Sequence, residues 1–161
     1  MTTAELAFPS LAEVLEQERT LQLSSATPAE IYALGRRAAD AALAEGLGIV
    51  VQIRIGDRVA FMASLPGGTA LNDNWAERKA RTCHLFEQSS MRVRLELEAE
   101  GADLQKRHGL PPEKYAANGG AFPLRVAGVF AGSIVVSGLP QVEDHAFIVR
   151  ILGEHIAAAA R

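Results

Sequence analysis

Apolar residues recur at helical spacing in two segments near the start of the chain. Ser10 and Glu13 have the spacing of a capping box, and the apolar stripe that follows predicts a helix from about 10 to 22. Thr27 begins a second segment of the same kind, which predicts a helix over 28–45. Alanine is frequent in this second helix, and such small side chains allow close packing against a neighbouring element.

Runs of β-branched and aromatic residues come in two pairs, 47–55 with 58–65 and 122–128 with 131–138. A two-residue Gly-Asp link joins the first pair, which is a hairpin signal. A short glycine-containing link joins the second pair. The sequence therefore predicts two β-hairpins, and a further short strand is expected near 115–119.

Helical segments lie between the hairpins and after them. Asn74 and Glu77 form another capping box, which predicts that a helix begins at Asn74. Residues 91–107 begin with the alternation of a strand, but opposite charges four residues apart and good helix formers favour a helix over the whole segment. The segment from Pro140 onward again has helical spacing.

The order of these elements predicts an α+β fold, in which helices pack on an antiparallel sheet. The chain has 161 residues with 48% hydrophobic content, which is enough for one core. No internal repeat and no long linker divides it. We therefore expect a single domain over 1–161, with the helix at about 10–22 as an appendage.

Composition and charge argue against several classes of protein. The net charge is −3 and no block of Lys and Arg stands out, so no nucleic acid is expected as a partner. No window is continuously apolar over a membrane-spanning length, and the first residues lack the pattern of a signal peptide, so no membrane partner is expected. The single cysteine, Cys83, suits a reducing compartment. The sequence thus predicts a cytoplasmic protein.

The four histidines lack the spacing of a metal site, so no metal is expected. His145 has the most suggestive neighbours, because it follows Glu143 and Asp144 in the first turn of the last helix. Acids are favourable at a helix N-terminus, which is a sufficient structural reason for both. Adjacent helical residues point about 100° apart, so Asp144 and His145 are not expected to form a dyad. A catalytic function would require His145 to share a proton with a carboxylate and to face a pocket.

Two turns next to the predicted sheet are candidate binding elements. Ser137 ends a strand just before the last helix, where backbone N–H groups can hold an anion. Gly119 and Gly120 allow close approach of a ligand or another chain, although a bulge or turn would also explain them. Neither turn matches a nucleotide-binding motif.

Three longer motifs follow one another along the chain: NDNWAERKARTCHLFEQSS, YAANGGAFPLRV and GSIVVSGLPQVEDH. Together they resemble the HbpS/GlcG-like family, also called the heme-degrading domain family. The resemblance runs from about residue 27 to the C-terminus. It implies a profilin-like unit with a five-stranded antiparallel sheet, assembled into homo-oligomers. Some relatives bind or degrade heme, so the resemblance implies heme as a candidate cofactor.

The same motifs carry the family's candidate site residues onto this chain. The ligand-binding candidates are Trp75, Lys79, Tyr115, Asn118, Gly119, Gly120, Phe122, Ser137 and Gly138. The catalytic candidates are Glu143, Asp144 and His145. Close relatives commonly have the residues HGGGFP where this chain has NGGAFP. Asn118 cannot replace a histidine as a proton shuttle or as a usual iron ligand.

Three functions remain open at this point. In the first, heme or another small anionic ligand binds beside the paired glycines, where Lys79 meets a carboxylate and Trp75 or Phe122 stacks on the ring. In the second, the chain is a non-catalytic oligomeric scaffold or interaction module, with contacts through the alanine-rich helix 28–45. In the third, the acids and the histidine of the last motif act as acid or base in an enzyme without a metal.

Overall fold

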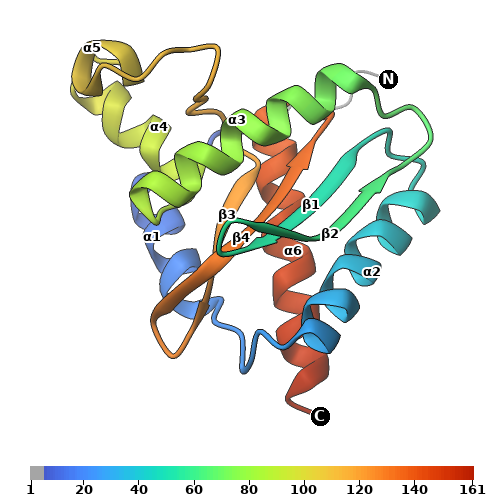
Figure 1. The fold of residues 1–161 in the computed structure, drawn as a ribbon. Helices are drawn as coiled ribbons and strands as arrows, with labels where there is room; N and C mark the ends of the chain where they lie inside the picture. Colours follow the sequence, from blue (N-terminus) through green and yellow to red (C-terminus); the bar gives the residue numbers. More distant parts are fainter. Residues whose placement is uncertain (1–5) are drawn as a thin grey trace.

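The computed structural model describes residues 6–161 and has the α+β architecture that the order of the elements predicts (Figure 1). Four antiparallel strands form one sheet in the order β2-β1-β4-β3. The elements in chain order are α1 (Leu11–Thr20), α2 (Pro28–Ala44), β1 (Val50–Ile55), β2 (Arg58–Ser64), α3 (Ala70–Phe86), α4 (Ser90–Ala99), α5 (Leu104–His108), β3 (Ala121–Val126), β4 (Val129–Ser137) and α6 (Gln141–Ala159).

Helices cover both faces of the sheet. α2 and α6 pack side by side on one face, and α3 lies across the other face, mainly over β3 and β4 (Figure 1). α1 and α4 pack on each other near β3. β2 remains an edge strand, and most of its side chains are exposed or only half-buried.

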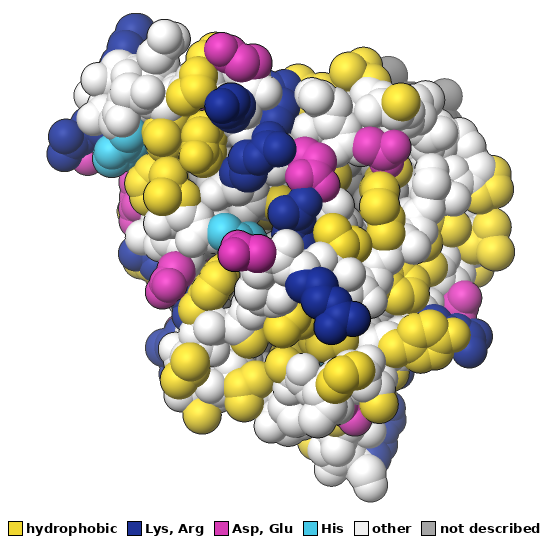
Figure 2. All heavy atoms as spheres, in the orientation of Figure 1, with side chains coloured by type: hydrophobic (Ala, Val, Ile, Leu, Met, Phe, Trp, Pro, Cys, Tyr) yellow, Lys and Arg dark blue, Asp and Glu magenta, His cyan; other side chains and the backbone are white. Residues whose placement is uncertain are grey.

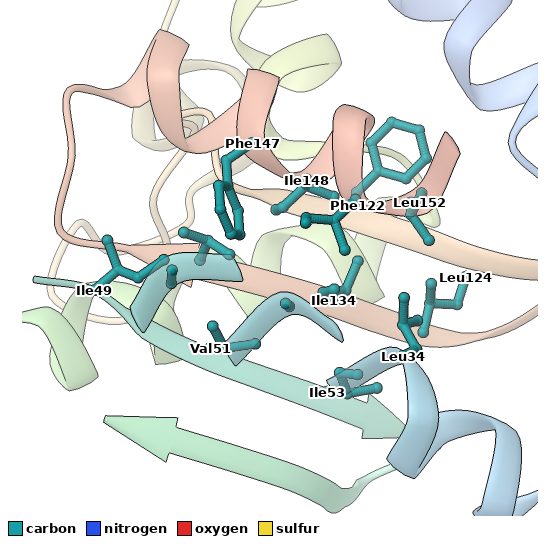
Figure 3. Packing of buried hydrophobic residues seen from close by; sticks show 14 of the residues in the cluster. Leu34, Ile49, Val51, Ile53, Phe122, Leu124, Ile134, Phe147, Ile148 and Leu152 are labelled. Atoms are coloured by element: carbon teal, nitrogen blue, oxygen red, sulfur yellow. The ribbon is translucent and has the colours of Figure 1, made fainter. Parts of the chain in front are cut away.

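The main hydrophobic core fills the space between the sheet and the layer of α2 and α6 (Figure 3). Alternate strand residues such as Val51, Ile53 and Ile134 point into this space. They meet Leu34 from α2 and Ile148 from α6, and all five side chains are fully buried. A smaller cluster on the other face joins small residues of α3 to the sheet. Removal of this apolar surface from water is the main favourable term in folding.

Both predicted hairpins are confirmed, but the second turn lies earlier than the predicted link near Gly128–Gly132, most of which belongs to β4. A turn at Gly56-Asp57 joins β1 to β2, and a turn at Ala127-Gly128 joins β3 to β4. Ala127 and Gly128 both have positive φ values, 50° and 79°. Positive φ at both central residues is typical of the tight turn that matches the twist of the flanking strands.

The sheet has four strands and not the five that the family resemblance implies. The expected strand near 115–119 does not form, because helices take up its backbone donors. A side chain of α3 accepts the N–H of Ala116, and a side chain of α6 accepts the N–H of Gly119. At the β3 edge, Leu23 contributes an isolated parallel bridge to Val126 in place of a strand.

Two helix boundaries also differ from the prediction. The side chain of Thr69 caps α3, so this helix begins before Asn74 and the predicted cap lies inside it. The segment 91–107 is helical as predicted, but it is divided into two helices. Gly101 has a φ of 64°, which ends α4, and Asp103 then caps α5.

Gly35 on α2 lies directly under the ring of Phe61 from β2. We predict that Gly35→Ala lowers the free energy of unfolding by about 1–3 kcal/mol, because the new methyl group overlaps the ring. Gly153→Ala in α6 is the matched control, since no neighbouring described atom lies within 4 Å of its new methyl group. This control is expected to stabilise the protein by up to about 1 kcal/mol. Urea unfolding measures both, and equal stability of the two variants would contradict the prediction.

Candidate functional site

A buried ion pair links α3 to α6 beside the end of β4. Lys79 Nζ lies 2.8 Å from Asp144 Oδ2 and donates a second hydrogen bond of 3.1 Å to the carbonyl oxygen of Val136. The two side chains are 4% and 1% exposed, so the pair is largely shielded from solvent. Because α3 and α6 lie on opposite faces of the sheet, this contact connects two layers that the strands otherwise separate.

Two glycines make room for the residues around this ion pair. Gly120 has a φ of 126°, and a Cβ at this position would lie 2.6 Å from Lys79 Nζ and 3.0 Å from Asp144 Cβ. Gly138 has a φ of 145°, and a Cβ there would lie 2.5 Å from the carbonyl oxygen of Gly48. Side chains are strained at such φ values. Packing and backbone conformation therefore require both glycines.

Burial controls the protonation of the pair. It raises the pKa of Asp144 to about 6, while Lys79 and the N–H of Leu139, 3.1 Å from Oδ1, oppose the rise. Burial also lowers the pKa of Lys79. The 2.8 Å contact sets the ammonium of Lys79 against the carboxylate of Asp144, so the two opposite charges compensate each other. A buried carboxyl with a raised pKa that faces a cavity is a candidate acid or base.

A cavity of about 450 Å³ lies between α3, α4, α5 and the segment 110–118. We call it the arginine cavity, because Arg78 and Arg94 line it beside several apolar side chains. The Nε atoms of both arginines are buried and have no hydrogen-bond partner in the described part of the chain. Arg94 forms an ion pair of 2.7 Å with Glu98. On this face of the molecule, basic side chains lie next to hydrophobic ones over α3 and beside α4 and α5 (Figure 2).

A smaller cavity of about 260 Å³ lies against the buried ion pair. We call it the amide cavity, because the carboxamides of Asn72, Asn118 and Gln141 line it. Ser137 adds a hydroxyl group at the end of β4. The cavity is therefore polar, and the ion pair of Lys79 and Asp144 forms its floor.

An aromatic and a guanidinium group separate the two cavities. Trp75 lines the amide cavity and Arg78 lines the arginine cavity. The Cζ atom of Arg78 lies 4.1 Å from the centroid of the Trp75 ring, a distance typical of a cation–π contact. Asn118 lines both cavities and so lies at their boundary.

The structure places the candidate site residues in several different surroundings. The amide cavity is lined by six of them: Trp75, Lys79, Asn118, Ser137, Gly138 and Asp144. Tyr115 lines the arginine cavity, and Gly119 and Gly120 pack against α6, Gly120 also against α3. Phe122 is fully buried in the main core. Glu143 lines a separate surface hollow beside the N-terminal segment.

His145 faces α1 and lines none of these cavities. Its Nε2 lies 2.8 Å from Gln17 Oε1, and its ring centroid lies 6.0 Å from that of Phe122. Its Nδ1 has no partner among the described residues. Burial lowers the pKa of His145 to about 4, so the ring is neutral at pH 7. Asp144 and His145 point in different directions, in agreement with the spacing of adjacent residues on a helix.

Other reactive groups offer no alternative site in residues 6–161. No group of three or more His, Cys, Asp and Glu side chains there could hold a metal ion. Cys83 is fully buried, and burial raises the pKa of its thiol, which therefore stays protonated and unreactive. Within the same residues, every helix is too short or too polar to cross a membrane.

Sequence reasoning did not single out Asn72, Arg94 or Gln141 as site residues. In the sequence, Arg94 is typical of a surface ion pair with Glu98, and nothing local indicates that α5 folds back over it. Gln141 does lie inside one of the motifs that carry the family resemblance. That motif was the only available signal for it.

A model of the family described as "Haem degrading protein HbpS-like" matches residues 27–152, which is most of the chain. The chain belongs to the HbpS-like family. A UPF0303 protein of Streptomyces avermitilis is 41% identical over 145 residues, which cover 89% of this chain and 89% of that protein.

Two solved structures share the fold of this HbpS-like chain. The crystal structure of the Ybr137w protein has a TM-score of 0.84 at 24% identity, and the match covers 93% of this chain and 90% of that one. The crystal structure of a PduOC:heme complex has a TM-score of 0.67 at 20% identity, with 83% and 94% covered. At such identities the likeness concerns the fold alone.

Breaking the buried ion pair should destabilise the HbpS-like fold. We predict that Lys79→Met lowers the free energy of unfolding by about 3–5 kcal/mol at pH 7, because Asp144 then either stays charged without a cation or must bind a proton that the unfolded chain does not bind at this pH. The double variant Lys79→Met/Asp144→Leu should recover part of this loss. Arg36→Gln is the control, since its ion pair with Asp40 is exposed and should contribute less than about 1 kcal/mol. A single variant as stable as this control would contradict the prediction.

The neutral His145 should make stability depend on pH. In the unfolded chain His145 has a pKa of about 6.5 and binds a proton when the pH falls below that value. In the folded chain its pKa is about 4, so it binds a proton only at lower pH. The stability contributed by neutral His145 is thus present above pH 6.5 and is lost as the pH falls toward 4. We predict that the advantage of the wild type over His145→Gln shrinks by about 2 kcal/mol between pH 7 and pH 5.

Urea unfolding of both proteins at each pH measures this difference. The raised pKa of Asp144 makes the folded state more stable as the pH falls over the same range. This contribution is the same in both proteins, so it cancels in the difference between their free energies of unfolding. A difference between the two proteins that does not change with pH would contradict the prediction.

Proposed function

We propose that this HbpS-like chain binds a flat, largely apolar ligand with carboxylate groups in the arginine cavity, and that heme is such a ligand. The observation that supports this is the pair of guanidinium groups of Arg78 and Arg94, whose buried Nε donors have no partner in the described chain. A buried donor without a partner costs free energy, and a carboxylate in the cavity would give these guanidinium groups a charge-assisted partner. Arg94 already pairs with Glu98, so Arg78 is the freer cation.

The other lining residues fit heme as well. Leu97, Leu104 and Leu110 offer an apolar surface for a macrocycle. If heme is bound, Tyr115 would be the residue in this cavity able to hold its iron, because a phenol oxygen belongs to the known ligand types. Asn118 stands where the family resemblance leads us to expect a histidine. The description of the family and the heme complex of PduOC support heme as the ligand class.

The proposal assigns the recognition of the anion to arginines and not to Lys79. The charge of Lys79 is already neutralised by Asp144 at 2.8 Å. His145 is turned toward α1 and is not proposed as an iron ligand. Among the catalytic candidates, Asp144 alone combines a raised pKa with a position in a cavity that also holds Lys79.

An oligomeric scaffold is the second candidate function, and one feature of the surface favours it. Tyr32 on α2 and Val59 and Met62 on β2 are between 43% and 58% exposed. An edge strand with free backbone groups beside apolar side chains is suited to pairing with another subunit. We therefore also propose that the chain forms a homo-oligomer, whether or not a ligand is bound.

We predict that hemin binds the purified protein saturably, at one molecule per chain, with a sharpened Soret band. Arg78→Gln and Arg94→Gln should each weaken binding by about tenfold, because each removes a charge-assisted hydrogen bond worth at least about 1.5 kcal/mol. Arg107→Gln on α5 is the matched control, since this arginine is exposed and outside the cavity. A visible-absorbance titration measures all four proteins.

Two further variants test the iron ligand. Tyr115→Phe should alter the Soret band if the phenol ligates the iron, and Asn118→His should shift the band and strengthen binding. Weak, unsaturable binding in every protein, or equal losses in all three arginine variants, would overturn the ligand proposal and favour the scaffold.

A further inference from the structure

The amide cavity differs from the arginine cavity in the kind of molecule it suits. Lys79 and Asp144 both line it, and their opposite charges compensate each other across a contact of 2.8 Å. An incoming anion would gain little from a lysine that is already neutralised, and it would be repelled by the Asp144 carboxylate. The floor therefore favours a neutral ligand over a charged one.

One hydroxyl group in this cavity has no partner among residues 6–161. Ser137 is 2% exposed, and its Oγ makes no hydrogen bond to any residue in 6–161, although the side chain lines the cavity. The hydroxyl is open to the cavity, so it is available to hydrogen-bond a molecule that enters there.

Further unpaired groups surround the hydroxyl. Gln141 uses its Oε1 to accept the N–H of Gly119 at 3.1 Å, which leaves its amide nitrogen as a free donor in the described chain. Asn72 uses its Oδ1 in the same way at the start of α3, so its amide nitrogen also remains free. The side-chain amide of Asn118 has neither of its atoms engaged within the described residues. The cavity therefore offers several donors and at least one carboxamide acceptor.

The indole of Trp75 gives the cavity a flat wall. The guanidinium of Arg78 covers one face of this ring, and the indole itself lines the amide cavity. A planar molecule can stack on such a surface, and the volume of about 260 Å³ limits it to a small ring system.

We propose that the amide cavity binds a small, neutral, planar compound that carries a carbonyl beside an N–H group, that is, a primary amide or a lactam. Its carbonyl oxygen would accept hydrogen bonds from Ser137 and from the free amide nitrogen of Gln141. Its N–H would donate to the carbonyl oxygen of Asn118. Its ring would stack on Trp75. The proposed ligand does not require heme in the arginine cavity, although Asn118 lines both cavities.

Nicotinamide, a ring primary amide, and uracil, a ring lactam, are suitable probes. Benzoate has the size of nicotinamide but carries a charge. Saturation-transfer NMR and calorimetry on the full chain should show saturable binding of one or both neutral probes at millimolar concentration, without competition by benzoate. Ser137→Ala should weaken binding by about fivefold, as expected for the loss of one hydrogen bond of about 1 kcal/mol.

Trp75→Leu should weaken probe binding further, because it removes the stacking surface. Arg94→Gln is the matched control: it should leave probe binding unchanged while it weakens hemin binding, so the two proposals can fail separately. Absence of binding of both neutral probes to the folded protein would overturn the proposal. Benzoate binding as tight as nicotinamide binding, or no effect of Ser137→Ala, would also overturn it.

Discussion

The buried contact between Lys79 and Asp144 is the interaction on which the rest of the site depends. Three motifs far apart in the sequence meet there: α3 brings the cation, the first turn of α6 brings the anion, and Gly120, just before β3, packs against both. A buried ion pair is tolerated only when both partners are present and further hydrogen bonds complete it. Val136 and Leu139 supply those bonds. The fold therefore requires these residues of the three motifs together, whether or not a ligand binds.

Local signals were sufficient for much of the fold. The Gly-Asp link gave the first hairpin, and the opposite charges of 91–100 indicated a helix in spite of their strand-like alternation. Local signals failed where two of them competed. Both Thr69 and Asn74 are good capping residues, and the helix starts at Thr69 because the earlier start adds backbone hydrogen bonds. The missing fifth strand was beyond local reasoning, since side chains of distant helices take up the donors of 115–119.

The sequence could name many residues of the candidate site but could not group them. Lys79 and Asp144 are both polar residues in motifs, yet nothing in their spacing shows that they neutralise each other. His145 is next to Asp144 in sequence and looks equally suited to chemistry, but its ring points into the packing around α1. Arg94 had no signal at all, because the fold of α5 over α4 creates its surroundings. Contacts between distant helices and strands determine which of these residues lie together, and such contacts cannot be deduced from a single sequence.

The stack of Arg78 on Trp75 joins two side chains that line different cavities. Each of these two side chains is held in place partly by the other. A substitution of either residue therefore removes a contact that supports the wall of both cavities, and its effects on the two are expected to be coupled and not additive.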